Sequence, residues 1–161
     1  MLFIGRDSSA RSILAEAVMN RVGAGKFVGY SAGAQPSGIV HPETIAILNH
    51  LQFDTTGLRS KSWEEFTGDG SPRMDAVITL SHSAAQESCP LWPGEPIGAD
   101  WLMPNPMTGE EDLRQLAFAV AYQMINHRIS IFTRLTDGDR TRSPDSADAW
   151  TGSFPGPLGR V

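Results

Sequence analysis

The sequence predicts an α/β fold in which a parallel sheet carries helices on both of its faces. Short apolar runs typical of strands alternate along the chain with segments of helical periodicity, an order that favours right-handed crossovers between parallel strands. The run MDAVITL at residues 74–80 places apolar and β-branched residues in succession. Such a run is typical of a strand that is buried on both faces.

The elements before this strand follow the same alternation. Residues 2–4 and 26–32 are expected to be short strands, and residues 12–22 (SILAEAVMNRV) have the apolar spacing of a helix. Pro42 opens the segment PETIAILNHL at the first position of the expected second helix, where proline is best tolerated. The segment SWEEF at 62–66 can add one or two helical turns.

A long helix is expected over residues 110–135. Three acidic residues in its first turn favour the helix dipole, namely Glu110, Glu111 and Asp112. Its apolar residues form one broad stripe, which we expect to dock against the core. The residues of the stripe are Leu113, Leu116, Ala117, Val120, Met124 and Ile125.

The length of 161 residues suits one domain with an ordinary hydrophobic core. We assign this domain to residues 1–135. Residues 136–161 are rich in Gly, Pro, Ser and Asp and have no periodicity, which predicts a disordered tail. Trp150 and Phe154 in this tail are expected to be exposed.

The bulk properties exclude several classes of function. A net charge of -5 without a dense Lys/Arg block argues against a nucleic-acid partner and against an anionic membrane surface. No run approaches the roughly 20 apolar residues that span a bilayer, and the N-terminus lacks a secretory pattern, so a cytoplasmic protein is expected. Cys89 is the only cysteine, which excludes an intramolecular disulfide and a cysteine cluster for zinc. We expect neither a cofactor nor a metal.

The stretch LFIGRDSSARSILAEA at residues 2–17 contains the clearest functional signal. It runs from an apolar strand through a polar loop to an arginine and the start of a helix. Main-chain N–H groups that converge at a helix N-terminus bind phosphate-like anions. Loops that act chemically on the anion usually carry a nucleophile at the end of the strand, and that position is Gly5.

Several motifs resemble one known family in order along the chain. They are SSARSILAEA, SAGAQPSGIVHPETIAIL, LRSKSWEEF, DAVITLSHSAAQESCPLWPGEP, ADWLMPNP and RISIF. Together they resemble the low-molecular-weight protein-tyrosine-phosphatase superfamily and, within it, the arsenate reductases of the ArsC type, over residues 2–135. The resemblance implies a four-stranded parallel sheet flanked by helices, in agreement with the pattern of elements above.

The resemblance also implies a reaction. In the family, a cysteine followed by five residues, arginine and serine attacks phosphorus or arsenic as a thiolate. The arginine clamps two oxyanion oxygens, and the aspartate of an Asp-Pro pair protonates the leaving oxygen. The family's arginine and serine map to Arg11 and Ser12. Gly5 occupies the nucleophile position, Asn105 replaces the acid before proline, and Ser81 replaces a further cysteine, so none of these catalytic positions is intact.

The expected function is therefore a pseudoenzyme that still binds phosphate, sulfate or arsenate. The expected anion-binding residues are Arg6, Asp7, Ser8, Ser9, Ala10, Arg11 and Ser12. Glycine at position 5 leaves the backbone free for close approach to an anion. Asp7 would repel the anion unless Arg6 pairs with it.

Each site residue also has a simpler interpretation. Arg11 would then be a surface arginine, Ser12 a plain helix N-cap and Asp7 a turn residue. We expect Cys89 to be a buried or idle thiol, and His41 to support the loop that starts the second helix. His82, Cys89 and Asp100 lack the short spacing typical of zinc ligands.

Two other functions stay open from the sequence. One is an active arsenate reductase or phosphatase that uses an external thiol as its nucleophile. The other is a pure protein-interaction module whose loop is vestigial. A homo-oligomer or a complex with an active paralogue is compatible with each of these functions.

Overall fold

The computed structural model describes residues 1–139 and contains a four-stranded parallel sheet in the order β2-β1-β3-β4. The strands are β1 (Leu2–Gly5), β2 (Tyr30–Gly33), β3 (Ala76–Thr79) and β4 (Ile97–Asp100). The helices are α1 (Arg11–Val22), α2 (Pro42–His50), α3 (His82–Ala85) and α4 (Arg114–Asp139), with 3-10 turns η1 (Trp63–Phe66) and η2 (Glu111–Leu113). Helices cover both faces of the sheet, as the sequence predicts.

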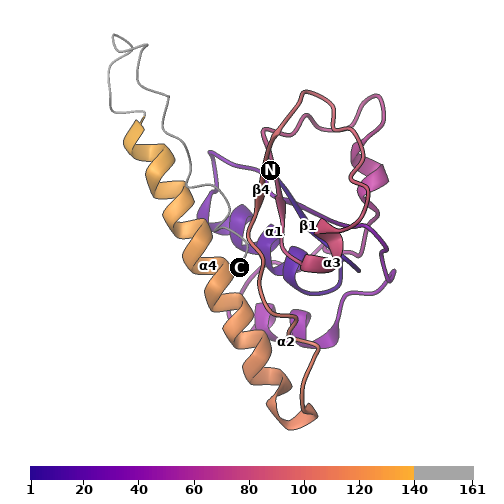
Figure 1. Cartoon of the computed structure of the whole chain (residues 1–161). Helices are drawn as coiled ribbons and strands as arrows, with labels where there is room; N and C mark the ends of the chain where they lie inside the picture. Colours follow the sequence, from indigo (N-terminus) through magenta and orange to yellow (C-terminus); the bar gives the residue numbers. More distant parts are fainter. Residues whose placement is uncertain (140–161) are drawn as a thin grey trace, which may run out of the picture.

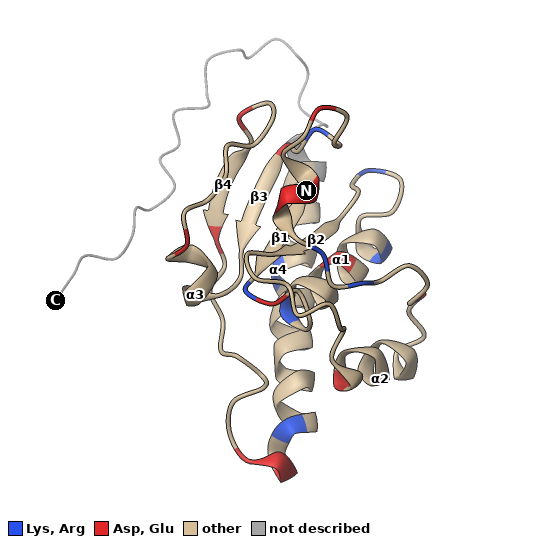
Figure 2. Cartoon of the chain, turned by 90° about the vertical axis from the view of Figure 1, so that its right-hand side faces the viewer, with Lys and Arg blue, Asp and Glu red and all other residues tan. Residues whose placement is uncertain are grey.

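The two faces of the sheet are buried in separate apolar clusters. Phe3 of β1 and Ile78 of β3 pack in one cluster with residues of α1 and α4, while Leu2 and Ile4 pack in the other with Phe66 of η1. This alternation follows from the two-residue period of a strand. Figure 1 shows α4 as a long helix along one side of the domain, and Figure 2 shows it behind the sheet.

β2 begins later than the predicted strand at 26–32. Residues before it turn back onto α1, because the side chain of Asn20 donates to Gly29 O at 3.0 Å and accepts from Gly29 N at 2.7 Å. The backbone of Gly29 is therefore hydrogen-bonded to a helix side chain before the strand starts at Tyr30. The strand pattern extended the prediction by a few residues because Phe27 and Val28 have strand propensity.

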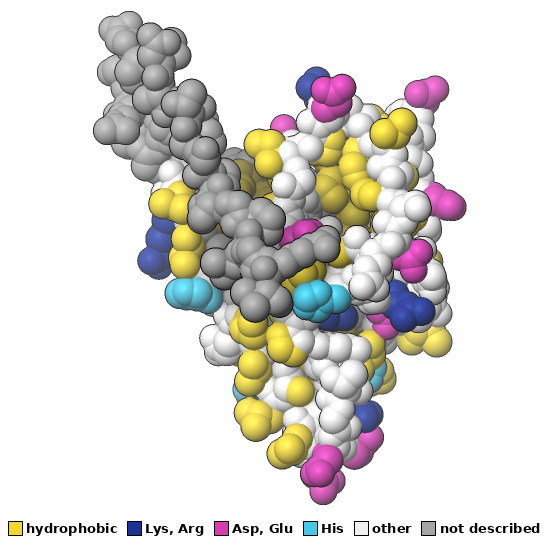
Figure 3. Space-filling view, viewed as in Figure 1, with side chains coloured by type: hydrophobic (Ala, Val, Ile, Leu, Met, Phe, Trp, Pro, Cys, Tyr) yellow, Lys and Arg dark blue, Asp and Glu magenta, His cyan; other side chains and the backbone are white. Residues whose placement is uncertain are grey.

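The predicted docking stripe is wrong for three of its six residues, whereas Ile125 is buried and Met124 packs against the core. Leu113, Leu116 and Val120 are 55%, 62% and 49% exposed. The face that packs on the core carries Phe118, Ala121, Ile125 and Ile129 instead. Apolar residues cover more than one side of this helix, so periodicity alone did not identify the buried side. Figure 3 shows apolar side chains gathered on the surface near the N-terminal half of α4.

α4 also continues past the predicted end of the domain at residue 135. It reaches Asp139, so the tail that the sequence predicts from residue 136 starts inside a helix. Trp150, Phe154 and the rest of residues 140–161 lie outside the described residues. Over residues 1–139, no helix has both the length and the apolar character needed to cross a bilayer.

Candidate functional site

The loop between β1 and α1 turns its carbonyl oxygens toward the surrounding chain. Four of these oxygens accept hydrogen bonds from backbone N–H groups of the segment after β2. The pairs are Ala34 N to Gly5 O at 3.3 Å, Gln35 N to Arg6 O at 2.8 Å, Ser37 N to Asp7 O at 2.9 Å and His41 N to Ser9 O at 2.9 Å. The segment after β2 therefore holds the loop in place through hydrogen bonds to the carbonyl oxygens of the loop.

The backbone N–H groups of the same loop, in contrast, lack hydrogen-bond partners. Within the part of the chain that the structure describes, none of the N–H groups of residues 7–10 donates a hydrogen bond. Buried backbone donors are normally paired, so a run of unpaired N–H groups at a helix start is a set of donors available to a ligand. The sequence predicts such donors at this loop.

Two residues fix the shape of the loop. Ser8 is buried and has a φ of 49°, in the left-handed region that few side chains adopt. Its Oγ accepts from Lys61 N at 3.3 Å. Gly33 ends β2 directly beside the loop, and a Cβ there would lie 2.6 Å from Arg6 O and 2.8 Å from Ser8 N. Only glycine permits this close approach.

Arg11 is not the surface arginine of the simpler interpretation. It is 8% exposed, and its Nη1 donates to Met103 O at 2.9 Å. Burial lowers the pKa of Arg11 from its ordinary value, and the negative charge of Asp7 partly opposes this change. A guanidinium remains charged at neutral pH even so, and its planar fork has donors beyond the one that Met103 uses.

The structure brings Arg11 together with two of the predicted degenerate positions. Arg11, Ser81 and Asn105 line one pocket of about 440 Å³, together with His82 and other residues. Ser81 Oγ caps α3 by accepting from Ala84 N at 3.2 Å. Asn105 Oδ1 accepts from Met107 N at 3.2 Å within a turn. Neither group is a carboxylic acid or a thiol that could take part in covalent chemistry at this pocket.

Gly5 and Ser12 face each other at the floor of the loop. A Cβ on Gly5 would lie 3.3 Å from Ser12 Oγ and 3.9 Å from Ser8 N. Ser12 is 1% exposed, and its Oγ makes no hydrogen bond within residues 1–139. The N-cap of α1 is Ala10, and no side chain caps this helix end. The plain N-cap interpretation of Ser12 is therefore wrong.

The negative charge of Asp7 opposes the lowering of the Arg11 pKa, yet Asp7 forms no ion pair with the adjacent Arg6 among residues 1–139. Arg6 Nη2 donates to Gln35 Oε1 at 3.3 Å instead. Ser9 Oγ donates to Asp7 Oδ2 at 3.3 Å. The negative charge of Asp7 therefore opposes an anion at this loop.

Cys89 is the only cysteine of the chain. Cys89 is exposed, contrary to a buried thiol, and its Sγ accepts from Trp92 Nε1 at 3.2 Å. It is not among the residues that line the pocket with Arg11. His82, Cys89 and Asp100 do not form a metal-binding group, and no such cluster of His, Cys, Asp and Glu occurs among residues 1–139.

Lys61 and Glu16 form an ion pair beside the loop that the sequence did not predict. Lys61 Nζ lies 3.0 Å from Glu16 Oε2 and donates to Ser31 Oγ at 3.0 Å, and Ser31 Oγ in turn donates to Glu16 Oε2. Lys61 is 6% exposed. These residues come from α1, β2 and the segment before η1, so no local sequence pattern connects them.

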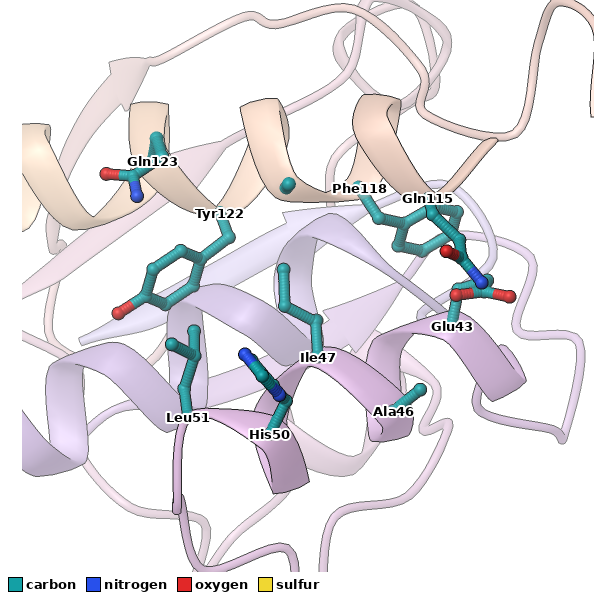
Figure 4. Close-up of a pocket in the computed structure, with 10 residues that line it drawn as sticks. Glu43, Ala46, Ile47, His50, Leu51, Gln115, Phe118, Tyr122 and Gln123 are labelled. Atoms are coloured by element: carbon teal, nitrogen blue, oxygen red, sulfur yellow. The ribbon is translucent and has the colours of Figure 1, made fainter. Parts of the chain in front are cut away.

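A second pocket, of about 430 Å³, lies between α2 and α4 and is shown in Figure 4. Apolar side chains such as Ile47 and Phe118 line it, and none of the predicted site residues does. Its α2 wall is connected to the loop between β1 and α1, because Thr44 Oγ1 donates to Ser9 O at 2.9 Å. His41 supports the start of α2 as predicted, since its Nδ1 accepts from Glu43 N at 3.2 Å.

Comparisons with known proteins agree with this architecture. A glutaredoxin arsenate reductase from Synechocystis sp. is 32% identical over 106 residues, which cover 66% of this chain and 77% of that protein. The crystal structure of an arsenate reductase from Archaeoglobus fulgidus has a TM-score of 0.62 and 22% identity, over 83% of this chain and 98% of that one.

A solved arsenate reductase in its phosphate-binding state is 26% identical, with a TM-score of 0.60, over 83% of this chain and 95% of that one. Residues 1–139 match the family described as low molecular weight phosphotyrosine protein phosphatase. The chain therefore belongs to the low molecular weight phosphotyrosine protein phosphatase family and is similar, within it, to the arsenate reductases.

Proposed function

We propose that the protein binds a phosphate-like oxyanion in the loop of residues 6–12 and does not carry out the family's nucleophilic reaction by itself. The observation that supports this proposal is how the backbone groups of the loop are paired. Its carbonyl oxygens accept hydrogen bonds from the segment after β2, while the N–H groups of residues 7–10 have no partner within residues 1–139. An anion at the N-terminus of α1 would satisfy these donors and would interact favourably with the helix dipole.

Arg11 supplies the positive charge that this ligand requires. It is buried beside the loop and lines the same pocket as Asn105 and Ser81. Asp7 acts in the opposite direction, because its carboxylate is not neutralised by Arg6. We expect phosphate, sulfate and arsenate to bind weakly, with dissociation constants on the order of millimolar.

The absence of catalysis follows from the residues at the site. Gly5 has no side chain that could attack phosphorus or arsenic, and the amide of Asn105 cannot donate a proton as a carboxylic acid does. Cys89 is not among the residues that line the pocket with Arg11. Loss of a nucleophile costs many powers of ten in rate, since only binding and electrostatic effects remain.

The related proteins support the choice of ligand. One similar solved structure is an arsenate reductase in a phosphate-binding state, and the Synechocystis relative is an arsenate reductase. Phosphate and arsenate have the same tetrahedral shape and charge. Both would use the same N–H donors and the same guanidinium.

Calorimetric titration with phosphate and with arsenate tests the proposal. We expect both anions to bind the wild-type chain, and we expect Arg11→Met to weaken binding by roughly tenfold or more, because one charge-assisted donor pair is lost. Arg134→Met removes an exposed arginine from α4 and is the matched control, with no expected change. Equal binding by wild type and Arg11→Met, or no binding by wild type, would overturn the proposal.

Assays of p-nitrophenyl phosphate hydrolysis and of arsenate reduction test whether the protein lacks the family's nucleophilic reaction. We expect no rate above buffer in either assay without an added thiol. Turnover that disappears in Arg11→Met would instead support an enzyme with an external nucleophile.

A further inference from the structure

The outer side of α4 carries a line of exposed apolar side chains, which we call the outer stripe. It consists of Leu113, at the end of η2, and of Leu116, Val120, Ile131 and Leu135 in α4. Their exposed fractions are 55%, 62%, 49%, 44% and 71%, in that order. Val120 and Ile131 are 11 residues apart, and Leu113 and Leu135 are twice as far apart. Because 11 residues make about three turns of an α-helix, the stripe keeps to one side of it.

The two halves of the outer stripe differ in shape. A groove of about 330 Å³ runs beside the N-terminal half, between α4 and the segment of residues 104–108. Leu116 and Val120 line this groove, together with two prolines of that segment, Pro104 and Pro106. Ile131 and Leu135 in the C-terminal half do not line it, and they are exposed one helical turn apart. One half of the stripe therefore has a groove, and the other half has exposed apolar side chains.

The position of α4 leaves its outer side accessible to another molecule. Figure 1 shows α4 along one edge of the domain, with the sheet and the other helices on its inner side, and Figure 3 shows apolar side chains along the same edge. A row of exposed apolar residues of this length is typical of a protein–protein contact. Removing these side chains from water would favour association.

We infer that the outer stripe binds a second copy of this chain, with the two α4 helices antiparallel about a two-fold axis near Met124. Met124 lies midway between Leu113 and Leu135 in the sequence, so this arrangement places Leu135 of one copy opposite Leu113 of the other. Ile131 likewise lies next to Leu116 of the other copy. The exposed side chains of each C-terminal half then enter the groove beside the N-terminal half of the other copy.

The antiparallel direction follows from this difference between the halves. A parallel pair would set groove against groove and would leave Ile131 and Leu135 to face only their own counterparts. Antiparallel helices also place the positive end of each dipole near the negative end of the other. The contact does not require an oxyanion at the loop between β1 and α1, so the dimer and the proposed function can be tested separately.

The dimer is expected to be weak. Val120 lies opposite His127 of the second copy, which is a polar residue in an otherwise apolar contact. A contact one helix wide and about 33 Å long is small for a permanent dimer, so we expect a dissociation constant on the order of 10–100 µM. Unfolding measured at protein concentrations well below this value reports on the monomer, in which the outer stripe is exposed.

Sedimentation of the full chain over a hundredfold range of concentration tests the association. We expect the mass to rise from monomer to dimer, and we expect Leu116→Asp and Leu135→Asp each to raise the dissociation constant by roughly tenfold or more, because the carboxylate would lose its hydration. Leu91→Asp is the matched control, since Leu91 is an exposed leucine outside the stripe, and it should behave as wild type. A wild-type monomer at every concentration, or a dimer that both stripe variants retain, would overturn the inference.

Cross-linking tests the antiparallel direction, in a Cys89→Ser background and with a short bismaleimide. We expect a cross-linked dimer when Leu113→Cys and Leu135→Cys chains are mixed. Each chain alone should give little, since equal positions on the two helices are then about 33 Å apart. Efficient cross-linking of either chain with itself, or none in the mixture, would contradict the arrangement.

Iodoacetamide labelling of the same two variants tests whether the chain covers its own stripe. We expect both introduced thiols to label readily at low protein concentration. A monomer in which both thiols resist labelling would mean that residues 140–161 cover the outer stripe, and the inference would be wrong.

Discussion

Gly33 is the residue at which the sheet and the anion loop approach most closely. Its substitution by alanine would place a methyl group 2.6 Å from Arg6 O and 2.8 Å from Ser8 N. Because both contacts are to backbone, the loop has to move, and we expect a loss of about 1–3 kcal/mol in the free energy of unfolding. Urea denaturation measures this loss. Gly98→Ala is the control, and equal stability of the two variants would show that the loop adapts without strain.

Restoration of the missing groups tests whether the rest of the site is intact. Gly5→Cys places a thiol at the N-terminus of α1 beside Arg11 and Ser12, and Asn105→Asp supplies a proton donor. We expect the thiol pKa to fall below its usual value of about 8.5 and aryl-phosphate hydrolysis to become detectable. The rate should stay well below that of an ordinary family member, because Asp7 still repels the substrate.

The measurement is the phosphatase rate together with iodoacetamide labelling against pH, in a Cys89→Ser background so that only the introduced thiol reacts. Gly5→Cys alone and Asn105→Asp alone are the matched controls. An ordinary thiol pKa without any activity would mean that the loop no longer stabilises an anion. The pure interaction module would then become the better description.

The sequence predicts the positions of the candidate site residues, but not their hydrogen bonds. Gly5, Arg11, Ser81 and Asn105 were assigned from short motifs, and three of them line one pocket. The unpaired state of Ser12 could not be predicted, because it depends on which acceptors other segments bring near its hydroxyl.

Helix α4 has two apolar faces, and one of them is buried against the core. Ile125 lies in the core, whereas Leu116 is 62% exposed. We expect Ile125→Ala to cost about 2–5 kcal/mol of unfolding free energy, and Leu116→Ala to cost less than about 0.5 kcal/mol. Thermal or urea unfolding of the two variants measures the difference. A large loss in Leu116→Ala would show that its face is covered in solution.

The buried ion pair connects three elements next to the loop. Lys61→Met would leave the carboxylate of Glu16, whose side chain is 12% exposed, with a hydrogen bond from Ser31 but without its cation, and we expect a loss of about 3–5 kcal/mol in the free energy of unfolding. Glu16→Leu combined with Lys61→Met removes both charges and should recover most of that loss. Urea denaturation of the single and double variants measures the coupling. If the double variant is no more stable than Lys61→Met, the pair is not the source of the loss.

Elements with a strong local sequence pattern lie close to their predicted positions, whereas β4 has no such pattern and was not assigned to a segment. β3 and α2 lie within the predicted segments because a β-branched run and an N-terminal proline are local signals. β4 has the sequence IGAD at the edge of the sheet, with mostly exposed side chains, so no apolar pattern identifies it. Its pairing with β3 is a tertiary contact that only the folded chain provides.

Three separate parts of the chain hold the loop between β1 and α1. The segment after β2 binds its carbonyl oxygens, Thr44 of α2 donates to Ser9 O, and Met103 after β4 accepts from Arg11. The order β2-β1-β3-β4 places the end of β1 inside the sheet, where parallel sheets bind ligands at their carboxyl ends. Contacts from these three parts of the chain therefore hold the loop in place at the carboxyl end of β1.

A crystal structure of the protein grown in phosphate will show whether the loop of residues 6–12 binds an oxyanion. We expect a phosphate ion at the start of α1, contacted by main-chain N–H groups of residues 6–11 and by the guanidinium of Arg11. Crystals of Arg11→Met under the same conditions should show a weaker ion or none. A loop collapsed over Gly5, with no phosphate and with Arg11 turned into solvent, would rule out oxyanion binding by this loop.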